Sequence, residues 1–373
     1  GYFNEVNIET PAVQGTTDQV DVNVSVAEKS TGSIMLGAGF SSSEGIVLSG
    51  SVSQSNVFGT GNRLSAQINS GSVNTVYALS FTNPYYTIDG VSLGYDLYRR
   101  DVDATSLSNV GAYKTSTYGA GVRFGLPVNE RDFLSFGLTY EQTSLTTYSD
   151  SPVQYTRFVN EFGKDNDTVR LDTSWSRDTR DSYLFPTKGL MQRVAAEVGT
   201  PGGSLQYYKL SFQHQQYIPL SKSFTLMLNG EVGIGDGLSG KPLPFFKNFY
   251  AGGNSSVRGF KTGTLGPKDA NGDALGGDKR VVGNAEVFFP LPGLKDDQSL
   301  RMSAFVDAGA TFGPDDKDNL YKTFAFGDLR YSAGIAVLWV SPLGPLKFSL
   351  AQPIVKKTGD KAEMFQFTLG NVF

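Results

Sequence analysis

Apolar and polar residues alternate along most of the chain, in segments of about ten residues. In "GSIMLGAGF", Ile34, Leu36, Ala38 and Phe40 share one face, and small or polar residues occupy the other. The final segment, "EMFQFTLGNVF", alternates in the same way. A period of two residues is typical of β-strands with one apolar and one polar face. These segments therefore predict strands that separate an apolar environment from a polar one.

Sixteen segments of this kind follow one another from residue 33 onward. They span 33–40, 45–53, 62–70, 75–82, 91–101, 115–125, 132–145, 167–178, 188–200, 205–218, 223–234, 280–290, 299–309, 330–341, 345–352 and 363–373. Compact connections such as "GTGN" and "PLSKS" alternate with long polar ones at 146–166, 235–279 and 310–328. Bacterial outer-membrane barrels have even strand numbers, short periplasmic turns and longer outside loops.

The pattern predicts an all-β fold: a 16-stranded antiparallel transmembrane β-barrel with lipid-facing apolar side chains and a polar lumen. A soluble β-sandwich or propeller is the alternative, and sixteen long strands without a blade repeat disfavour it. We expect the barrel to occupy residues 31–373.

Residues 1–30 have a different pattern, with two predicted strands at Asn4–Glu9 and Gln19–Glu28. A lone hairpin is marginally stable in water, so we expect this segment to be the end of a larger soluble domain. The chain begins at Gly1 without an initiator Met or an apolar signal segment. We therefore expect a mature fragment whose signal lies upstream.

Composition excludes several classes of function. A net charge of −4 gives no basic footprint for nucleic acid. Cysteine is absent and only one histidine is present, which excludes thiolate metal sites and histidine-based triads. "DANGDALGGDKR" lacks the sixth-position glycine and twelfth-position glutamate of a calcium loop, so we predict a solvated loop there. The sequence thus predicts no enzyme, no metal and no cofactor.

One arginine, Arg258, lies in a loop rich in glycine and serine, "NFYAGGNSSVRGFKTG". On the predicted strands 280–290 and 299–309, alternation turns Glu286 and Asp307 toward the lumen. If the intervening turn centres near Lys295, Glu286 opposes a residue near Ala304, and the two carboxylates lie close together. Such carboxylates repel each other unless a cation joins them.

The loop is long enough to supply that cation. Half of its roughly 30 residues would extend about 50 Å, twice the height of a barrel's apolar band of about 25 Å. A guanidinium can bond two carboxylates at once. We hypothesise that this extracellular loop folds inward and that Arg258 clamps Glu286 and Asp307. The spacing alone equally allows a surface arginine and two unrelated lumenal acids.

With "FYAGGNSSVRGF", "SAGIAVLWVSPLGPLKFSLAQP" and "GDKAEMFQFTLGNVF", the chain resembles the BamA family of outer-membrane assembly factors over essentially its whole length. The resemblance implies that the motif Val257, Arg258, Gly259 and Phe260 reaches the lumen and that Arg258 pairs with the two acids. It also implies that residues 1–30 end the last periplasmic POTRA domain, with the N-terminus in the periplasm.

The resemblance further implies a role in inserting and folding other β-barrel proteins in the bacterial outer membrane. The implied partners are unfolded outer-membrane protein clients, lipoproteins of the BAM complex, periplasmic chaperones and outer-membrane lipid. A polypeptide secretion pore of the two-partner type, from the same superfamily, is the main alternative. A passive porin and an outer-membrane lipase are weaker ones, and no serine pairs with the histidine in register to support the lipase.

The first and last strands must pair to close the barrel, because no open sheet edge survives in lipid. The first is short and carries Gly37 and Gly39, the last carries Gly370, and glycine weakens strands. We predict that this seam is the weakest in the barrel and can open to template a client strand. Alternatively, these glycines only fit the curvature of the sheet. The predicted seam consists of Ser33, Ile34, Met35, Leu36, Gly37, Ala38, Gly39, Phe40, Gln366, Phe367, Thr368, Leu369, Gly370, Asn371, Val372 and Phe373.

Overall fold

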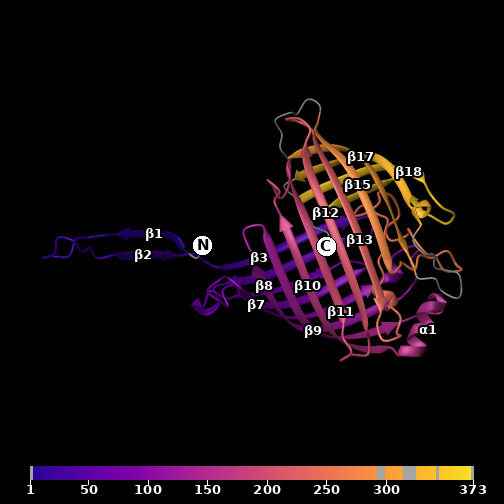
Figure 1. The fold of residues 1–373 in the computed structure, drawn as a ribbon, viewed down its shortest axis with the longest axis horizontal. Coiled ribbons are helices and arrows are strands. Elements are labelled where there is room, and N and C mark those ends of the chain that lie inside the picture. The colour runs from indigo at the N-terminus through magenta and orange to yellow at the C-terminus, as the bar shows by residue number, and fades with distance from the viewer. Residues whose placement is uncertain (1–2, 292–298, 314–324, 342–343, 371–373) are drawn as a thin grey trace.

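The computed structural model of the chain describes residues 3–291, 299–313, 325–341 and 344–370 (Figure 1). Sixteen antiparallel strands close into a barrel, which confirms the predicted fold and strand number. Within the described ranges, no helix has the length and apolar character needed to cross a membrane. The predicted turn centre at Lys295 and the seam residues Asn371, Val372 and Phe373 lie outside these ranges.

The barrel strands follow the predicted segments closely, because each was identified from its own alternation. They are β3 (Gly32–Ser41), β4 (Gly45–Ser55), β5 (Arg63–Ser70), β6 (Asn74–Asn83), β7 (Ser92–Asp103), β8 (Lys114–Pro127), β9 (Asp132–Thr146), β10 (Asp165–Asp178), β11 (Gly189–Gly199), β12 (Tyr207–Pro219), β13 (Thr225–Gly237), β15 (Lys279–Pro290), β16 (Leu300–Phe312), β17 (Arg330–Ser341), β18 (Gly344–Val355) and β20 (Phe365–Leu369).

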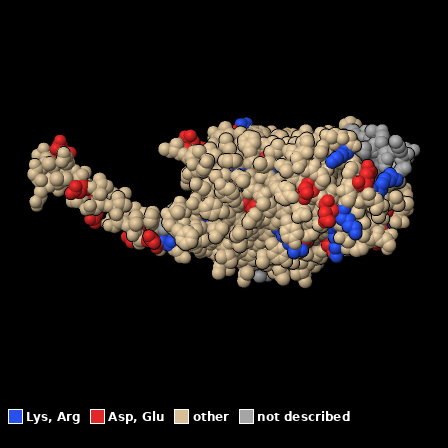
Figure 2. Space-filling view, turned by 90° about the horizontal axis from the view of Figure 1, so that it is seen from below, with Lys and Arg blue, Asp and Glu red and all other residues tan. Residues whose placement is uncertain are grey.

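Alternating exposure along the strands separates a lipid-facing side from a lumenal side. On β9, Leu138 and Tyr140 are exposed, whereas Thr139, Glu141 and Thr143 between and beyond them are buried. The buried polar residues face a lumen that loops fill, so the expected orientation of the two faces holds. Figure 2 shows that charged side chains gather toward the end of the barrel opposite the N-terminal hairpin.

Short helices occur in the connections, and the sequence pattern did not predict them. The 3-10 helices are η1 (Val57–Gly59), η2 (Ala104–Ser106), η3 (Phe245–Lys247) and η4 (Phe326–Asp328), and the α-helix is α1 (Val153–Phe162). Within α1, Tyr155 and Phe158 are buried against Phe245, which comes from the loop between β13 and β15. Aromatic packing between separate loops therefore covers, on this side, the end of the lumen away from the N-terminal hairpin (Figure 1).

The N-terminal strands β1 (Phe3–Glu9) and β2 (Asn23–Glu28) form a separate hairpin that extends away from the barrel (Figure 1). The second strand begins at Asn23 rather than at the predicted Gln19. Its cross-strand pairs Val6–Val26 and Ile8–Val24 form an apolar ladder whose residues are all exposed.

Two expectations are wrong in detail. The first barrel strand is not short, since β3 has ten residues, and the short partner at the seam is β20 with five. The segment "DANGDALGGDKR" is not solvated throughout, because Ala274, Leu275 and Asp278 are buried. Its carbonyl and amide groups bond to neighbouring loops, and these bonds draw the second half of the segment into the barrel mouth.

Candidate functional site

The loop between β13 and β15, residues 238–278 and here called the long loop, carries the "VRGF" motif into the lumen. Val257 and Phe260 are fully buried and pack with Ala251, Leu265 and Val282. Val282 belongs to β15, so this cluster ties the motif to the barrel wall. Apolar burial therefore seats the motif, and Arg258 between the two buried residues is held against the strands.

Arg258 lies between the two predicted carboxylates. Its Nε and Nη2 donate to the two oxygens of Asp307 at 2.7 and 2.8 Å, and its Nη1 donates to Glu286 Oε2 at 3.0 Å. Its backbone N–H also donates to Asp307 Oδ2 at 3.0 Å. All three residues are almost completely buried. We call this trio the loop clamp; a bidentate guanidinium of this kind fixes both distance and orientation.

Neighbouring residues complete the loop clamp. The Arg258 Cζ lies 3.3 Å from the centroid of the Phe305 ring, a cation–π contact. Asn284 donates to both Asp307 Oδ1 and the Ser256 carbonyl, at 2.8 and 2.7 Å. Ser303 donates to Glu286 Oε1. Each carboxylate is thus bonded by more than the arginine.

The register confirms that Glu286 opposes a residue near Ala304. Its partner is Phe305, the neighbour of Ala304, and Asp307 pairs with Asn284. Asn284 lies two residues from Glu286, and Phe305 lies two residues from Asp307, so all four side chains point to the lumen. This alternation could have identified Asn284 and Phe305 as residues of the site. A search restricted to charged residues missed them.

The other half of the motif contacts β18 and the segment just before the last strand. Gly259 has φ +86°, and a Cβ there would lie 3.1 Å from the Ala351 Cβ, so only glycine suits this position. Gly259 and Phe260 form the short strand β14 (Gly259–Phe260), which pairs with β19 (Ala362–Glu363) just before β20. The long loop therefore pairs with the segment that leads into β20.

Gln366, predicted as a seam residue, is a lumenal residue in this contact. It is buried, its Nε2 donates to the Phe260 carbonyl at 2.9 Å, and its Oε1 accepts from the Gly259 N–H at 3.4 Å. Asn254 Nδ2 of the long loop also donates to Thr368 Oγ1 at 2.9 Å. The loop clamp and β20 are consequently parts of one hydrogen-bonded assembly.

A second anchor, which was not predicted from the sequence, holds the long loop on the opposite wall. Lys247 donates to Glu197 of β11 at 2.7 Å and lies 3.8 Å from Glu141 of β9. Glu141 also bonds Arg170 of β10 and Tyr98 of β7. The loop thus spans the lumen between two charged attachments.

The seam between β3 and β20 is joined by only two residue pairs among the described residues, Ser41–Thr368 and Phe40–Leu369. By comparison, β3 and β4 share ten pairs, and β18 and β20 share five. The rings of Phe40 and Phe367 stack across the seam with centroids 4.8 Å apart.

The remaining predicted seam residues are not brought together by strand pairing in the described ranges. On β3, Ser33 to Gly39 pair with β4 alone, although Gly370 approaches the backbone of Ala38 and Gly39. Ile34, Met35 and Leu36 are 74%, 61% and 86% exposed. Consecutive residues point to opposite faces of a strand, so both faces of this part of β3 are open.

Comparisons with known proteins agree with this architecture. An Omp85 superfamily domain model matches residues 56–373. The outer membrane protein assembly factor BamA of Neisseria meningitidis serogroup B is 43% identical over all of this chain, which covers 51% of that protein. The chain spans about half the length of the relatives of this kind that it matches.

Solved structures give the same result. BamA from Haemophilus ducreyi lacking POTRA domains 1–3 superposes with a TM-score of 0.93 at 32% identity, covering 99% of this chain and 75% of that one. CdiB from Acinetobacter baumannii matches with a TM-score of 0.62 at 14% identity, covering 98% of this chain and 64% of that one, and shares the fold alone.

The closed barrel, its apolar outer face and these relatives identify a β-barrel of the bacterial outer membrane. The range that matches the Omp85 domain model includes the long loop, the loop clamp and all strands from β5 onward. The chain belongs to the Omp85 superfamily, and within it the chain is a homologue of the outer-membrane protein assembly factor BamA.

Proposed function

We propose that this barrel inserts and folds client β-barrel proteins in the bacterial outer membrane, with the β3–β20 seam as the template and without enzymatic catalysis. The observation that carries the proposal is that, among the described residues, two pairs join β3 to β20, whereas ten join β3 to β4 and five join β18 to β20. Few ladder hydrogen bonds need to break before an edge is exposed. An unpaired strand edge binds another chain by β-augmentation.

In this mechanism the client strand pairs first with β3. The exposed backbone between Gly32 and Ala38 supplies donors and acceptors, and lipid offers a client no other partner for them. Each added client strand presents a new edge to the next. Folding then proceeds by successive hairpins at the membrane, without a covalent step or a cofactor.

The loop clamp has a positioning role in this proposal. Through Gln366 and Thr368 the long loop holds β20 from inside the lumen. Among the described residues, β20 is thus bonded by the long loop, whereas β3 pairs with β4 alone along most of its length. We propose that opening moves β3 away from a fixed β20.

We propose the partners that this role requires: unfolded outer-membrane protein clients, BAM lipoproteins, periplasmic chaperones and outer-membrane lipid. The exposed hairpin β1–β2 supports a periplasmic attachment point, and we propose that residues 1–30 complete a POTRA domain there. A secretion pore is less well supported, because the long loop spans the lumen and aromatic loop packing covers its extracellular end.

A disulfide across the seam tests the proposal. The chain has no native cysteine, and Ser41 and Thr368 are direct cross-strand partners, within the Cα separation that disulfides need. The pair Ser41→Cys and Thr368→Cys would be oxidised in the full-length protein. Folding of an unfolded barrel client into liposomes would then be followed with and without reductant. We expect the lock to stop client folding and the reductant to restore it.

The matched control is Ser33→Cys with Ser53→Cys, which joins β3 to β4 at a pair whose hydroxyls already lie 2.8 Å apart. This bond spans strands that the mechanism never separates, so client folding should continue at the unlocked rate. Equal folding rates with the β3–β20 seam locked and unlocked would exclude lateral opening.

A further inference from the structure

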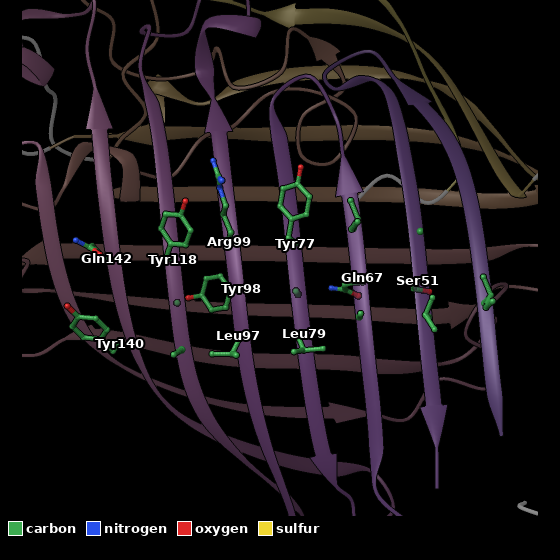
Figure 3. Close-up of a pocket in the computed structure, with 18 of the residues that line it drawn as sticks. Ser51, Gln67, Tyr77, Leu79, Leu97, Tyr98, Arg99, Tyr118, Tyr140 and Gln142 are labelled. Atoms are coloured by element: carbon green, nitrogen blue, oxygen red, sulfur yellow. The ribbon is translucent and has the colours of Figure 1, made fainter. Parts of the chain in front are cut away.

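An apolar hollow of about 800 Å³ lies on the outer face of β3 to β9, away from the loop clamp (Figure 3). Most of the side chains that line it have the outward alternation of their strands. Its apolar floor includes Leu36, Val52, Leu79, Leu97 and Ala120. Because Leu36 belongs to β3, the hollow extends to the strand that forms the seam.

Arg99 is the one charged residue among those that line the hollow. It alternates with the exposed, outward-facing Leu97 on β7, so its side chain leaves the barrel on the lipid side. Strand register sets Tyr77 and Tyr118 directly opposite it on β6 and β8. Figure 3 shows Arg99 between these tyrosines, with the three polar ends pointing the same way, toward the end of the barrel where β7 finishes.

The guanidinium is only partly engaged by the protein. Its Nε lies 3.0 Å from Asp101 Oδ2, and its Cζ lies 5.3 Å from the Tyr118 ring centroid. Among the described residues, the hydrogen bonds of Arg99 come from Nε, which leaves the two terminal nitrogens for another acceptor. The side chain is 46% exposed.

A guanidinium on a lipid-facing surface is costly unless acceptors near the interface bond its donors, and Asp101 bonds that of Arg99 through Nε alone. Tyrosines concentrate at the level of lipid headgroups, so Tyr77 and Tyr118 mark that level here. Below it, toward the barrel's middle, the floor of the hollow is apolar. This arrangement matches a molecule with an anionic head and a hydrocarbon tail.

We propose that the hollow binds one lipid with a phosphate-bearing headgroup. Its phosphate is bonded by the terminal nitrogens of Arg99, and an acyl chain lies over Leu97 and Leu79 toward Leu36. The fork of the guanidinium suits phosphate oxygens, and the tyrosine hydroxyls on either side are further donors. The proposed lipid site lies on the outer face alone, so its test does not depend on the role of the seam.

Native mass spectrometry of the full chain in detergent tests the proposal. The probes are phosphatidylglycerol and a diacylglycerol with the same acyl chains. We expect one phosphatidylglycerol to bind about fivefold more tightly than the diacylglycerol, the preference that one interfacial cation supplies. Arg99→Gln should abolish the preference, and inorganic phosphate should not displace the lipid.

Arg123→Gln is the matched control. Arg123 on β8 is 51% exposed and pairs with Asp96 at 3.3 Å, but its alternation turns it inward, so its loss should leave the preference intact. Ala120→Trp fills the hollow and should weaken both lipids without changing their ratio. All variants are compared as folded barrels, judged by heat-modifiable gel mobility.

Three results would overturn the proposal: an unchanged preference in Arg99→Gln, an equal loss in Arg123→Gln, or displacement by inorganic phosphate alone. If Arg99→Gln does not fold, Ala120→Trp decides the matter, because unchanged lipid binding in that variant would also exclude the site.

Discussion

Arg258 makes four hydrogen bonds to two buried carboxylates, and the strength of the loop clamp depends on this one residue. Ion pairs in a buried site stabilise little relative to an apolar replacement, since both partners lose their hydration. Removing only one partner is different, because it leaves uncompensated charge in the wall. Arg258 therefore matters mainly because its removal would leave two buried carboxylates without a counter-charge.

We expect Arg258→Ala to destabilise the loop and the β15–β16 wall by about 3–5 kcal/mol, because Glu286 and Asp307 would be stranded. Urea unfolding of the barrel in liposomes measures this change. Adding Glu286→Gln and Asp307→Asn to Arg258→Ala should recover most of the lost stability. If the triple variant is no more stable than Arg258→Ala, the carboxylates are not the source of the effect.

At the scale of elements, the long loop and β20 support each other. Among the described residues, β20 pairs with β3 at two positions, and Gln366 and Thr368 join it to the loop from inside the lumen. A strand at the edge of a weak seam would otherwise fray. The loop thus replaces, on one side, support that a neighbouring strand normally provides.

Gln366→Leu should loosen β20. Loss of its bonds to Gly259 and Phe260 leaves buried backbone groups unsatisfied, at about 1–3 kcal/mol, so amide exchange in Phe365–Leu369 should accelerate roughly tenfold. Hydrogen–deuterium exchange with mass spectrometry measures it. Gln352→Leu is the control, because the Gln352 amide bonds only its own neighbour, Pro353, among the described residues. Unchanged exchange in Gln366→Leu would show that the loop does not hold the strand.

At the scale of the whole molecule, the hairpin and the barrel are unequal in stability. The barrel closes on itself, whereas β1 and β2 leave the apolar ladder of Val6, Ile8, Val24 and Val26 open to water. A two-stranded hairpin of this kind needs a covering surface. This is the observation behind the proposed POTRA domain.

If residues 1–30 complete a POTRA domain, as proposed, we expect the ladder to be covered in a protein that carries the whole domain. Amide exchange across Phe3–Glu28 should then slow by at least tenfold, a protection of about 1.4 kcal/mol. Exchange in β12 serves as the control and should not change. If Phe3–Glu28 exchanges equally fast in both proteins, residues 1–30 do not complete a domain.

The sequence predicted the strands well because lipid on one side and a polar lumen on the other impose a two-residue period on each strand. It predicted Glu286 and Asp307 as lumenal for the same reason. The partner of Glu286 could be predicted only as a residue near Ala304, because alternation fixes the face of a residue but not its partner, which is Phe305.

Contacts made by loops were harder to predict. Helix α1 depends on the packing of Tyr155 against Phe245, 90 positions away, and no local pattern in the sequence predicts that contact. Gln366 has the alternation of any lumenal residue, and only the path of the long loop makes it the partner of Gly259 and Phe260. The fold could therefore be predicted from local alternation. The contacts of the site could not, because they depend on the path of the long loop's backbone.

The stacked rings of Phe40 and Phe367 give the seam a direction. Among the described residues, they lie beside the two pairs that join β3 to β20, at the extracellular end of β3. In the proposed mechanism, an incoming chain from the periplasm pairs first with the periplasmic part of β3 and separates the two rings last. Pairing would then advance outward across the membrane.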